Sequence, residues 1–289
     1  MDNQTQLLGR FLELSIPTTD IIESLGFYKL LGFHELLAGE VWKHRYAVVS
    51  DGVLCIGLHE RKFDRPALTF VHHDLARQAR SMTDHGFHFE YLKINPDIFN
   101  EVGFYDRDGH LVTMIEARTF SPAQEIYDDS VCGTWFEITL PVREVMRAAQ
   151  FWAPLAPELL RLREEPTTHM RFNAGGMSLG LSESIALSGP SLCFRCHDKD
   201  RVWTSIAQHG FRFKEFPGFE GAMMSLQAPE GTMLYLFDED FLGELIVVAE
   251  GDEAAQEEFA KRKKNKPGSG KKAKTKAKTK KKATKKKKK

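Results

Sequence analysis

The chain has 289 residues, enough for two domains of ordinary size, and 42% of its residues are hydrophobic, enough for a packed core. No run of about eighteen apolar residues occurs, which argues against a transmembrane helix. The first residues lack the basic and apolar segments of a secretory signal. Its four cysteines do not suggest a disulfide framework. We therefore expect a cytoplasmic protein with no part in a membrane.

The formal net charge of zero conceals an uneven distribution. Residues 261–289 contain 18 of the 40 Lys and Arg residues and no Asp or Glu, so residues 1–260 carry a net charge of −18. The lysine-rich end has almost no apolar side chains and cannot bury enough surface to offset the entropy cost of ordering. We expect a disordered tail at 263–289, preceded by an acidic extension at 241–262.

An internal repeat sets the architecture. Residues 12–20 (LELSIPTTD) lie 124 positions before residues 136–144 (FEITLPVRE), and the same spacing relates Phe27-Tyr28 to Phe151-Trp152. Near the ends of the two copies the spacing is 122, as between Asp108-Gly109 and Glu230-Gly231. A spacing that is kept over this length, with small shifts at turns, indicates duplication of a whole folded unit.

The first half of the first copy begins with a strand. Residues 11–16 alternate polar and apolar, as a half-buried strand does, and Thr18-Thr19-Asp20 provides an N-cap for a helix through about Leu31. Three strands are predicted next, near 33–38, 44–50 and 53–59. Asp51-Gly52 between the last two is a hairpin signal.

The second half repeats this order. Leu68–Val71 is a predicted strand, Asp74 caps a helix, and Gly86 ends that helix at the C′ position. Further strands are expected near 87–94, 101–105 and 110–116. Each copy is therefore βαβββ–βαβββ, and the chain contains four such units in an α+β fold.

Three segments also match a known family pattern. They are the strand–acid–helix opening at 11–20, the run FYKLLGF at 27–33 and the turn FYDRDG at 104–109. They resemble the vicinal-oxygen-chelate (VOC) superfamily, which includes glyoxalase I, extradiol dioxygenases and the bleomycin and fosfomycin resistance proteins. The resemblance implies two tandem modules, 8–120 and 134–240, joined by a linker at 121–133, each with a curved mixed sheet that forms a cup.

The resemblance also implies where a metal ion would bind. In this superfamily, side chains of the first, fifth and eighth strands, and sometimes the fourth, hold an ion such as Fe, Mn, Ni or Zn. Carried over to this chain, the positions are Glu13, Ala67, Thr113 and Gly57 in the first module, and Glu137, Ser191, Tyr235 and Gly180 in the second. One carboxylate among such residues cannot hold a divalent ion, so we expect no metal triad.

Three interpretations of the cups remain open. In the first, small residues such as Gly57 and Gly180 leave volume for a small organic ligand, for which the candidate contacts are Glu13, His59, Thr113, Glu137 and Tyr235. In the second, the chain is a metal-dependent lyase or dioxygenase, with His59 and Glu116 joining Glu13 as ligands after a register shift. In the third, the two glutamates are buried acids that only stabilise the sheets.

The tail suggests a separate kind of partner. Its segment KKAKTKAKTKKKATKKKKK resembles the tails of histone-H1-like bacterial proteins. Lysine at this density attracts polyanions with little sequence preference, so we expect non-specific nucleic-acid contact through 263–289. The alternative is a solubilising tail that folds back on the acidic body. The modules pair within one chain or between two chains of a homodimer.

Overall fold

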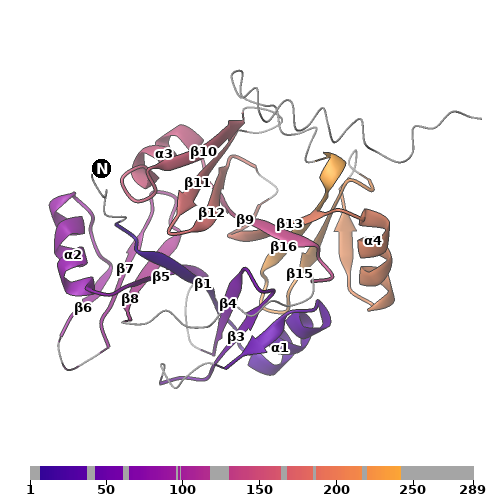
Figure 1. Cartoon of the computed structure of the whole chain (residues 1–289), viewed down its shortest axis with the longest axis horizontal. Helices are drawn as coiled ribbons and strands as arrows, with labels where there is room; N and C mark the ends of the chain where they lie inside the picture. Colours follow the sequence, from indigo (N-terminus) through magenta and orange to yellow (C-terminus); the bar gives the residue numbers. More distant parts are fainter. Residues whose placement is uncertain are drawn as a thin grey trace, which may run out of the picture. The chain divides into compact units, whose positions relative to one another are not determined.

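The structure, a computed structural model, describes residues 7–37, 43–60, 65–95, 97, 99–117, 130–163, 168–184, 187–216 and 220–241 (Figure 1). The predicted tail and nearly all of the acidic extension lie outside these residues. Both modules belong to one compact unit that spans Met1–Ala249. No helix in the described part of the chain is long and apolar enough to cross a membrane.

Module 1 contains the first eight strands and two helices. In chain order they are β1 (Arg10–Pro17), α1 (Ile21–Leu30), β2 (His34–Leu36), β3 (Tyr46–Ser50), β4 (Cys55–His59), β5 (Ala67–His72), α2 (Leu75–Asp84), β6 (Tyr91–Lys93), β7 (Glu101–Tyr105) and β8 (Leu111–Glu116).

Module 2 repeats this order. Its elements are β9 (Thr134–Pro141), α3 (Val145–Trp152), β10 (Glu158–Arg163), β11 (His169–Ala174), β12 (Met177–Ser182), β13 (Ser191–Cys196), α4 (Lys199–Gln208), β14 (Phe213–Glu215), β15 (Met223–Gln227) and β16 (Met233–Asp238).

The two sheets have the same topology. The strand orders are β2-β3-β4-β1-β5-β8-β7-β6 and β10-β11-β12-β9-β13-β16-β15-β14. In both, the first strand of the module is parallel to the fourth and antiparallel to the fifth. The predicted fold, with two tandem βαβββ–βαβββ modules and mixed sheets, is therefore confirmed.

The predicted helix boundaries follow from local chemistry. Asp20 accepts hydrogen bonds from the backbone N–H groups of residues 22 and 23, and Asp74 accepts one from residue 77. Gly86, with φ +85°, follows the end of α2 as expected of a C′ glycine. Strands β2 and β6 are shorter than predicted because each is a sheet edge, with a hydrogen-bonded neighbour on one side only.

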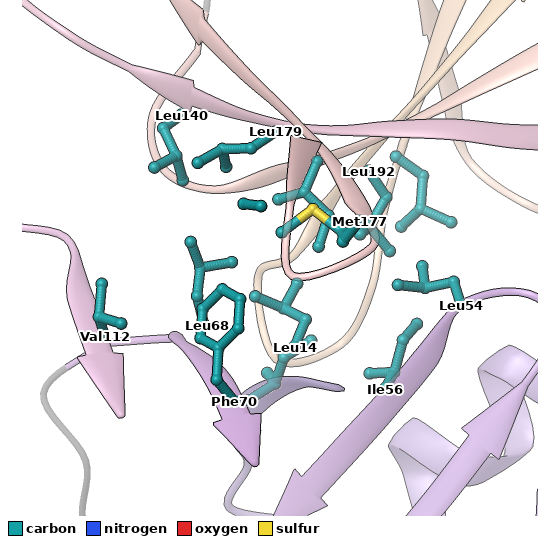
Figure 2. Close-up of a cluster of buried hydrophobic side chains, with 14 of the residues drawn as sticks. Leu14, Leu54, Ile56, Leu68, Phe70, Val112, Leu140, Met177, Leu179 and Leu192 are labelled. Carbon is teal, nitrogen blue, oxygen red and sulfur yellow. The ribbon is translucent and has the colours of Figure 1, made fainter. Parts of the chain in front are cut away.

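Alternate strand residues build one hydrophobic core that both modules share. Figure 2 shows Leu14, Leu68 and Phe70 of module 1 projecting toward Met177 and Leu179 of module 2. Since strand side chains alternate between faces, Glu13 and Ser15 of β1, and Glu137 and Thr139 of β9, lie on the face opposite to this core.

That opposite face carries polar side chains that are nevertheless buried. In module 1 they include Glu13, Ser15, Thr69 and Thr113, which pair across β1, β5 and β8. Burial on the side away from the shared core is what a curved sheet gives on its concave face. We call the face with Glu13 cup 1 and the corresponding face of module 2, with Glu137, cup 2.

Hydrogen bonds also join the modules at related positions. The Tyr28 hydroxyl of α1 donates to Glu230 (2.7 Å), in the turn between β15 and β16. Trp152 occupies the position of Tyr28 in the repeat, and its Nε1 donates to Asp106 (3.3 Å), between β7 and β8. The first helix of each module is thus bonded to the last hairpin of the other.

Candidate functional site in the two cups

A β-bulge precedes each of the two buried glutamates. In module 1, Phe11 pairs with Phe70 and Glu13 with Thr69, so Leu12 is an extra residue in β1. In module 2 the same shift leaves Phe136 as the extra residue before Glu137. Bulges re-aim the side chains beside them, and here both set the direction of a glutamate at the base of a cup.

In cup 1, three side chains hold the Glu13 carboxylate. Ser15 Oγ donates to Oε1 (2.7 Å), the Tyr46 hydroxyl donates to Oε2, and His59 Nε2 lies 3.0 Å from Oε1. Glu13 and His59 are each only 1% exposed. Burial raises the pKa of Tyr46 well above its usual value, and the nearby carboxylate raises it further. Tyr46 therefore stays protonated and remains a donor to Glu13.

A second histidine extends this network toward the surface. His44 Nε2 lies 2.9 Å from His59 Nδ1, and His44 is half-buried. With the proton of His59 on Nε2, facing the carboxylate, His59 Nδ1 accepts from His44 Nε2–H. The order Glu13–His59–His44 leads from a buried carboxylate to a more exposed imidazole. A carboxylate that orients an imidazole is an arrangement suited to moving a proton.

Hydroxyl groups link the two halves of cup 1. Ser15 Oγ lies 2.6 Å from Thr69 Oγ1, which in turn lies 2.7 Å from Thr113 Oγ1. Because Ser15 donates its proton to Glu13, it accepts from Thr69, and Thr69 accepts from Thr113. Thr113, a predicted ligand contact, therefore connects to Glu13 through two intervening hydroxyls.

The space above the two glycines next to the buried glutamates is filled, not open. A Cβ at Gly57 would lie 2.1 Å from Oε1 of Glu13, and one at Gly180 would lie 2.2 Å from Oε1 of Glu137. The expectation that these glycines leave volume for a ligand is wrong, because each carboxylate occupies the space above its glycine.

In cup 2, the Glu137 carboxylate has basic partners. Arg171 Nε donates to Oε2 (2.5 Å), His169 Nε2 lies 3.1 Å from the same oxygen, and Thr139 Oγ1 donates to Oε1 (2.5 Å). Burial alone raises the pKa of Glu137, but His169, Arg171 and Thr139 outweigh it and lower the pKa to about 2. Glu137 is ionised at neutral pH.

The other predicted contacts are distributed over both cups. Tyr235 lies in cup 2, where it is 3% exposed and burial raises its pKa. Glu116 lies at the end of β8, three residues from Thr113, so it faces the other side of the sheet. Its carboxylate accepts a hydrogen bond from Asn100 Nδ2 (2.6 Å). The structure brings Glu13 and His59 together and leaves Glu116 outside cup 1.

Sequence reasoning missed four of these residues: His44, Tyr46, His169 and Arg171. Tyr46 pairs with His59 across β3 and β4, and His169 pairs with Ser182 across β11 and β12. Tyr46 and His169 are therefore equivalent in the repeat, and both bond the glutamate of their cup. The alternation of polar residues at 44 and 46, and at 169 and 171, was the available signal.

The residues at the metal positions do not form a set of ligands for a divalent ion. Each module offers one carboxylate there, and in cup 2 that carboxylate is bonded to a guanidinium group, which would repel a cation. Within the described segments, no three His, Cys, Asp or Glu side chains cluster as metal ligands do.

The chain resembles solved ring-cleaving dioxygenases in three dimensions. An extradiol ring-cleaving dioxygenase from B. fuscum matches with a TM-score of 0.56 and 15% identity, over 80% of this chain and 71% of that one. The fold is that of extradiol dioxygenases. Homoprotocatechuate 2,3-dioxygenase from Arthrobacter globiformis (TM-score 0.53, 15% identity, 80% of each chain) and a catechol 2,3-dioxygenase (0.54, 14%, 80% of this chain and 88% of that one) match similarly.

These dioxygenases belong to the VOC superfamily, so the comparison supports the expected fold. At 14–15% identity the likeness extends to the fold alone. No protein-family model matches the sequence, and no curated protein matches it.

Proposed function

We propose that this chain binds a small organic ligand in the cup of a module without the usual metal triad. The dioxygenase fold supports the proposal, since a solved variant of homoprotocatechuate 2,3-dioxygenase with this fold is in complex with HPCA. The chain's four cysteines, none of them in a disulfide, are compatible with a place in the reducing cytoplasm.

One observation carries the metal-free part of the proposal: the chain itself provides the partners of both buried carboxylates. A buried charge needs either an opposite charge with hydrogen bonds or a metal ion. Glu137 has Arg171 and His169, while Glu13 has His59, Tyr46 and Ser15. A divalent ion is therefore not needed to keep either carboxylate in its cup.

A metal-dependent lyase or dioxygenase is the second candidate, because Glu13 and His59 are two adjacent donors and the fold is that of dioxygenases. Metal analysis of the full chain purified without chelators separates the two. We expect less than about 0.1 equivalent of Fe, Mn, Ni or Zn, because two donors hold such ions weakly. Near-stoichiometric metal would overturn the proposal.

Ligand binding itself is tested by a thermal-shift screen of small organic compounds against the full chain. A compound that binds the folded state raises the unfolding temperature. For a compound bound in cup 1, Glu13→Gln should weaken binding about tenfold, since a buried carboxylate partner is lost. Glu90→Gln, on the exposed surface, is the control. A screen in which no compound stabilises the chain would contradict the proposal.

The lysine-rich tail carries a separate proposal, non-specific binding of nucleic acid, supported by the 16 basic residues of 263–289, among which there is no acidic one. Truncation at Phe259 should abolish most of the affinity for DNA or RNA and its dependence on salt. An unchanged salt slope in the truncated chain would count against the tail as the binding element.

A further inference from the structure

Cup 2 contains a row of aromatic rings. Phe136, the bulge residue of β9, contacts Phe237 with ring centroids 6.1 Å apart. Phe237 stacks on Tyr235 at 6.5 Å, and Tyr235 contacts Phe216 at 6.0 Å. These separations lie within the range of favourable aromatic pairs. Tyr235 itself is buried, whereas Phe136, Phe216 and Phe237 are half-buried and offer apolar surface in the cup.

Two guanidinium groups converge on one end of this row. Arg171 lies 5.2 Å and Arg195 5.8 Å from the centroid of the Phe136 ring. A guanidinium group over an aromatic face is stabilised by the ring quadrupole, and its planar N–H groups can still donate hydrogen bonds. At the other end of the row, Lys214 Nζ lies 5.4 Å from the Phe216 centroid.

Much of the hydrogen-bonding capacity of these arginines is not used within the described residues. Arg171 bonds Glu137 through Nε, which fixes the plane of the guanidinium and leaves the terminal nitrogens available. Arg195 has no ion pair with any carboxylate that the structure describes. Both side chains are half-buried, so they are accessible to a small molecule but shielded from bulk water.

Carboxylates near this face are already engaged. Glu137 is neutralised by Arg171 and His169, and Glu239 pairs with His197 at 2.6 Å. At the edge of the sheet, Glu158 accepts a hydrogen bond from Asn173. Because Arg171 balances Glu137, the positive charge left for a ligand is that of Arg195.

Cup 1 lacks this arrangement at the equivalent positions. Val48 pairs with Gly57 as Arg171 pairs with Gly180, so valine stands where cup 2 has the first arginine. Val71 pairs with Arg10 as Arg195 pairs with Thr134, so valine also replaces the second. Duplication gave two equivalent sheets, and only cup 2 combines arginines with a row of rings.

We infer that cup 2 binds a planar aromatic carboxylate, with its ring against the aromatic row and its carboxylate on Arg171 and Arg195. The inference rests on the proposed ligand-binding function and names the ligand class of one cup. A planar anion matches both features, because guanidinium groups bind carboxylates in a bidentate manner and rings stack on rings.

The probe for the test is 2-naphthoate, titrated into the isotopically labelled full chain and followed in amide NMR spectra, which report both the affinity and the strands affected. Two matched probes separate the contributions: 2-naphthalenemethanol lacks the charge, and cyclohexanecarboxylate lacks the aromatic ring. We expect 2-naphthoate to bind about tenfold more tightly than either, with shifts in β9, β11, β13 and β16.

Arg195→Gln is the decisive variant, because Arg195 does not bond Glu137. We expect it to weaken 2-naphthoate binding about tenfold, while Arg147→Gln, which removes one exposed charge from α3, changes it by less than about twofold. The lysine-rich tail is the same in both variants, so any attraction of the tail for the probe contributes equally to the two affinities. If Arg195→Gln does not fold, Arg195→Lys, which keeps the charge but loses the planar fork, should weaken binding by a smaller factor.

Equal affinities in Arg195→Gln and Arg147→Gln, or shifts outside cup 2, would overturn the inference. If 2-naphthoate fails to bind but a screening compound binds and depends on Glu13, the ligand-binding function stands and only the assignment to an aromatic carboxylate falls. If neither binds, both fall.

Discussion

The Glu13 carboxylate lies directly over Gly57, where a Cβ would approach Oε1 to 2.1 Å. Both residues are in the interior of a sheet, so neither backbone can shift without breaking strand pairing. We expect Gly57→Ala to lower the free energy of unfolding by about 2–3 kcal/mol through overpacking. Urea unfolding followed by circular dichroism measures the change.

Gly26 provides the matched control. It lies within α1, and no atom lies within 4 Å of a Cβ placed there. Gly26→Ala should therefore stabilise the chain by up to about 1 kcal/mol, since alanine is the better helix former. A Gly57→Ala variant as stable as the parent would show that the carboxylate does not occupy the space above Gly57.

The low pKa of Glu137, about 2, predicts a specific acid sensitivity. Because this value lies below the ordinary 4.5, the ionised form stabilises the folded state at pH values above 4.5, and the stabilisation is lost as the pH falls toward 2. The difference in unfolding free energy between the parent and Glu137→Gln should shrink by about 1 kcal/mol between pH 7 and pH 3.5. Denaturant unfolding at several pH values measures it.

Glu90→Gln serves as the control for this pH series, since Glu90 is exposed. As a surface substitution, it should change the unfolding free energy by less than about 0.5 kcal/mol. A parallel pH dependence in the parent and in Glu137→Gln would mean that Arg171 and His169 do not hold the carboxylate in its ionised form.

The hydrogen bond between Tyr28 and Glu230 joins the two modules. We therefore expect the Tyr28 hydroxyl to contribute to the stability of the chain. Tyr28 is fully buried, and its hydroxyl donates to Glu230 at 2.7 Å. Tyr28→Phe should cost about 1–2 kcal/mol, because the carboxylate loses a donor in a partly desolvated position. Thermal unfolding gives the change.

Tyr105→Phe is the control, as Tyr105 is largely exposed, and we expect an effect below about 0.5 kcal/mol. Equal effects of the two substitutions would show that the hydrogen bond to Glu230 contributes nothing to module association.

The repeat and the alternation of polar and apolar residues were enough to predict the topology. The capping acids Asp20 and Asp74 and the turn glycine Gly86 are local signals, and each marks the end of a helix that the structure contains. These signals depend on neighbours in sequence, which is why they can be read without coordinates.

The cups depended on contacts that the sequence does not specify. Tyr46 meets Glu13, and His44 meets His59, only because β3 and β4 pair in a particular register beside β1. The small size of Gly57 suggests open space above it, but the long side chain of Glu13 reaches over from β1 and fills that space. Strand registers determine such contacts, and a shift of one residue would move every side chain to the other face.

The pair of Glu13 and His59 should behave as one coupled unit. Both are 1% exposed and their side chains are 3.0 Å apart. Removing either leaves the other buried without its main partner. The losses of unfolding free energy in Glu13→Gln and His59→Gln should therefore add up to more than the loss in the double variant. We expect a coupling energy of about 1–3 kcal/mol from a double-mutant cycle of unfolding free energies.

The same hairpin supplies the control for this cycle. Arg45 directly precedes β3 and Glu60 directly follows β4, with side chains 3.1 Å apart but exposed to 62% and 33%. Solvent screens that ion pair, so its coupling energy should be below about 1 kcal/mol. If the buried pair couples no more strongly than Arg45 and Glu60, then His59 does not hold the Glu13 carboxylate, and the route from Glu13 to His44 has no energetic basis.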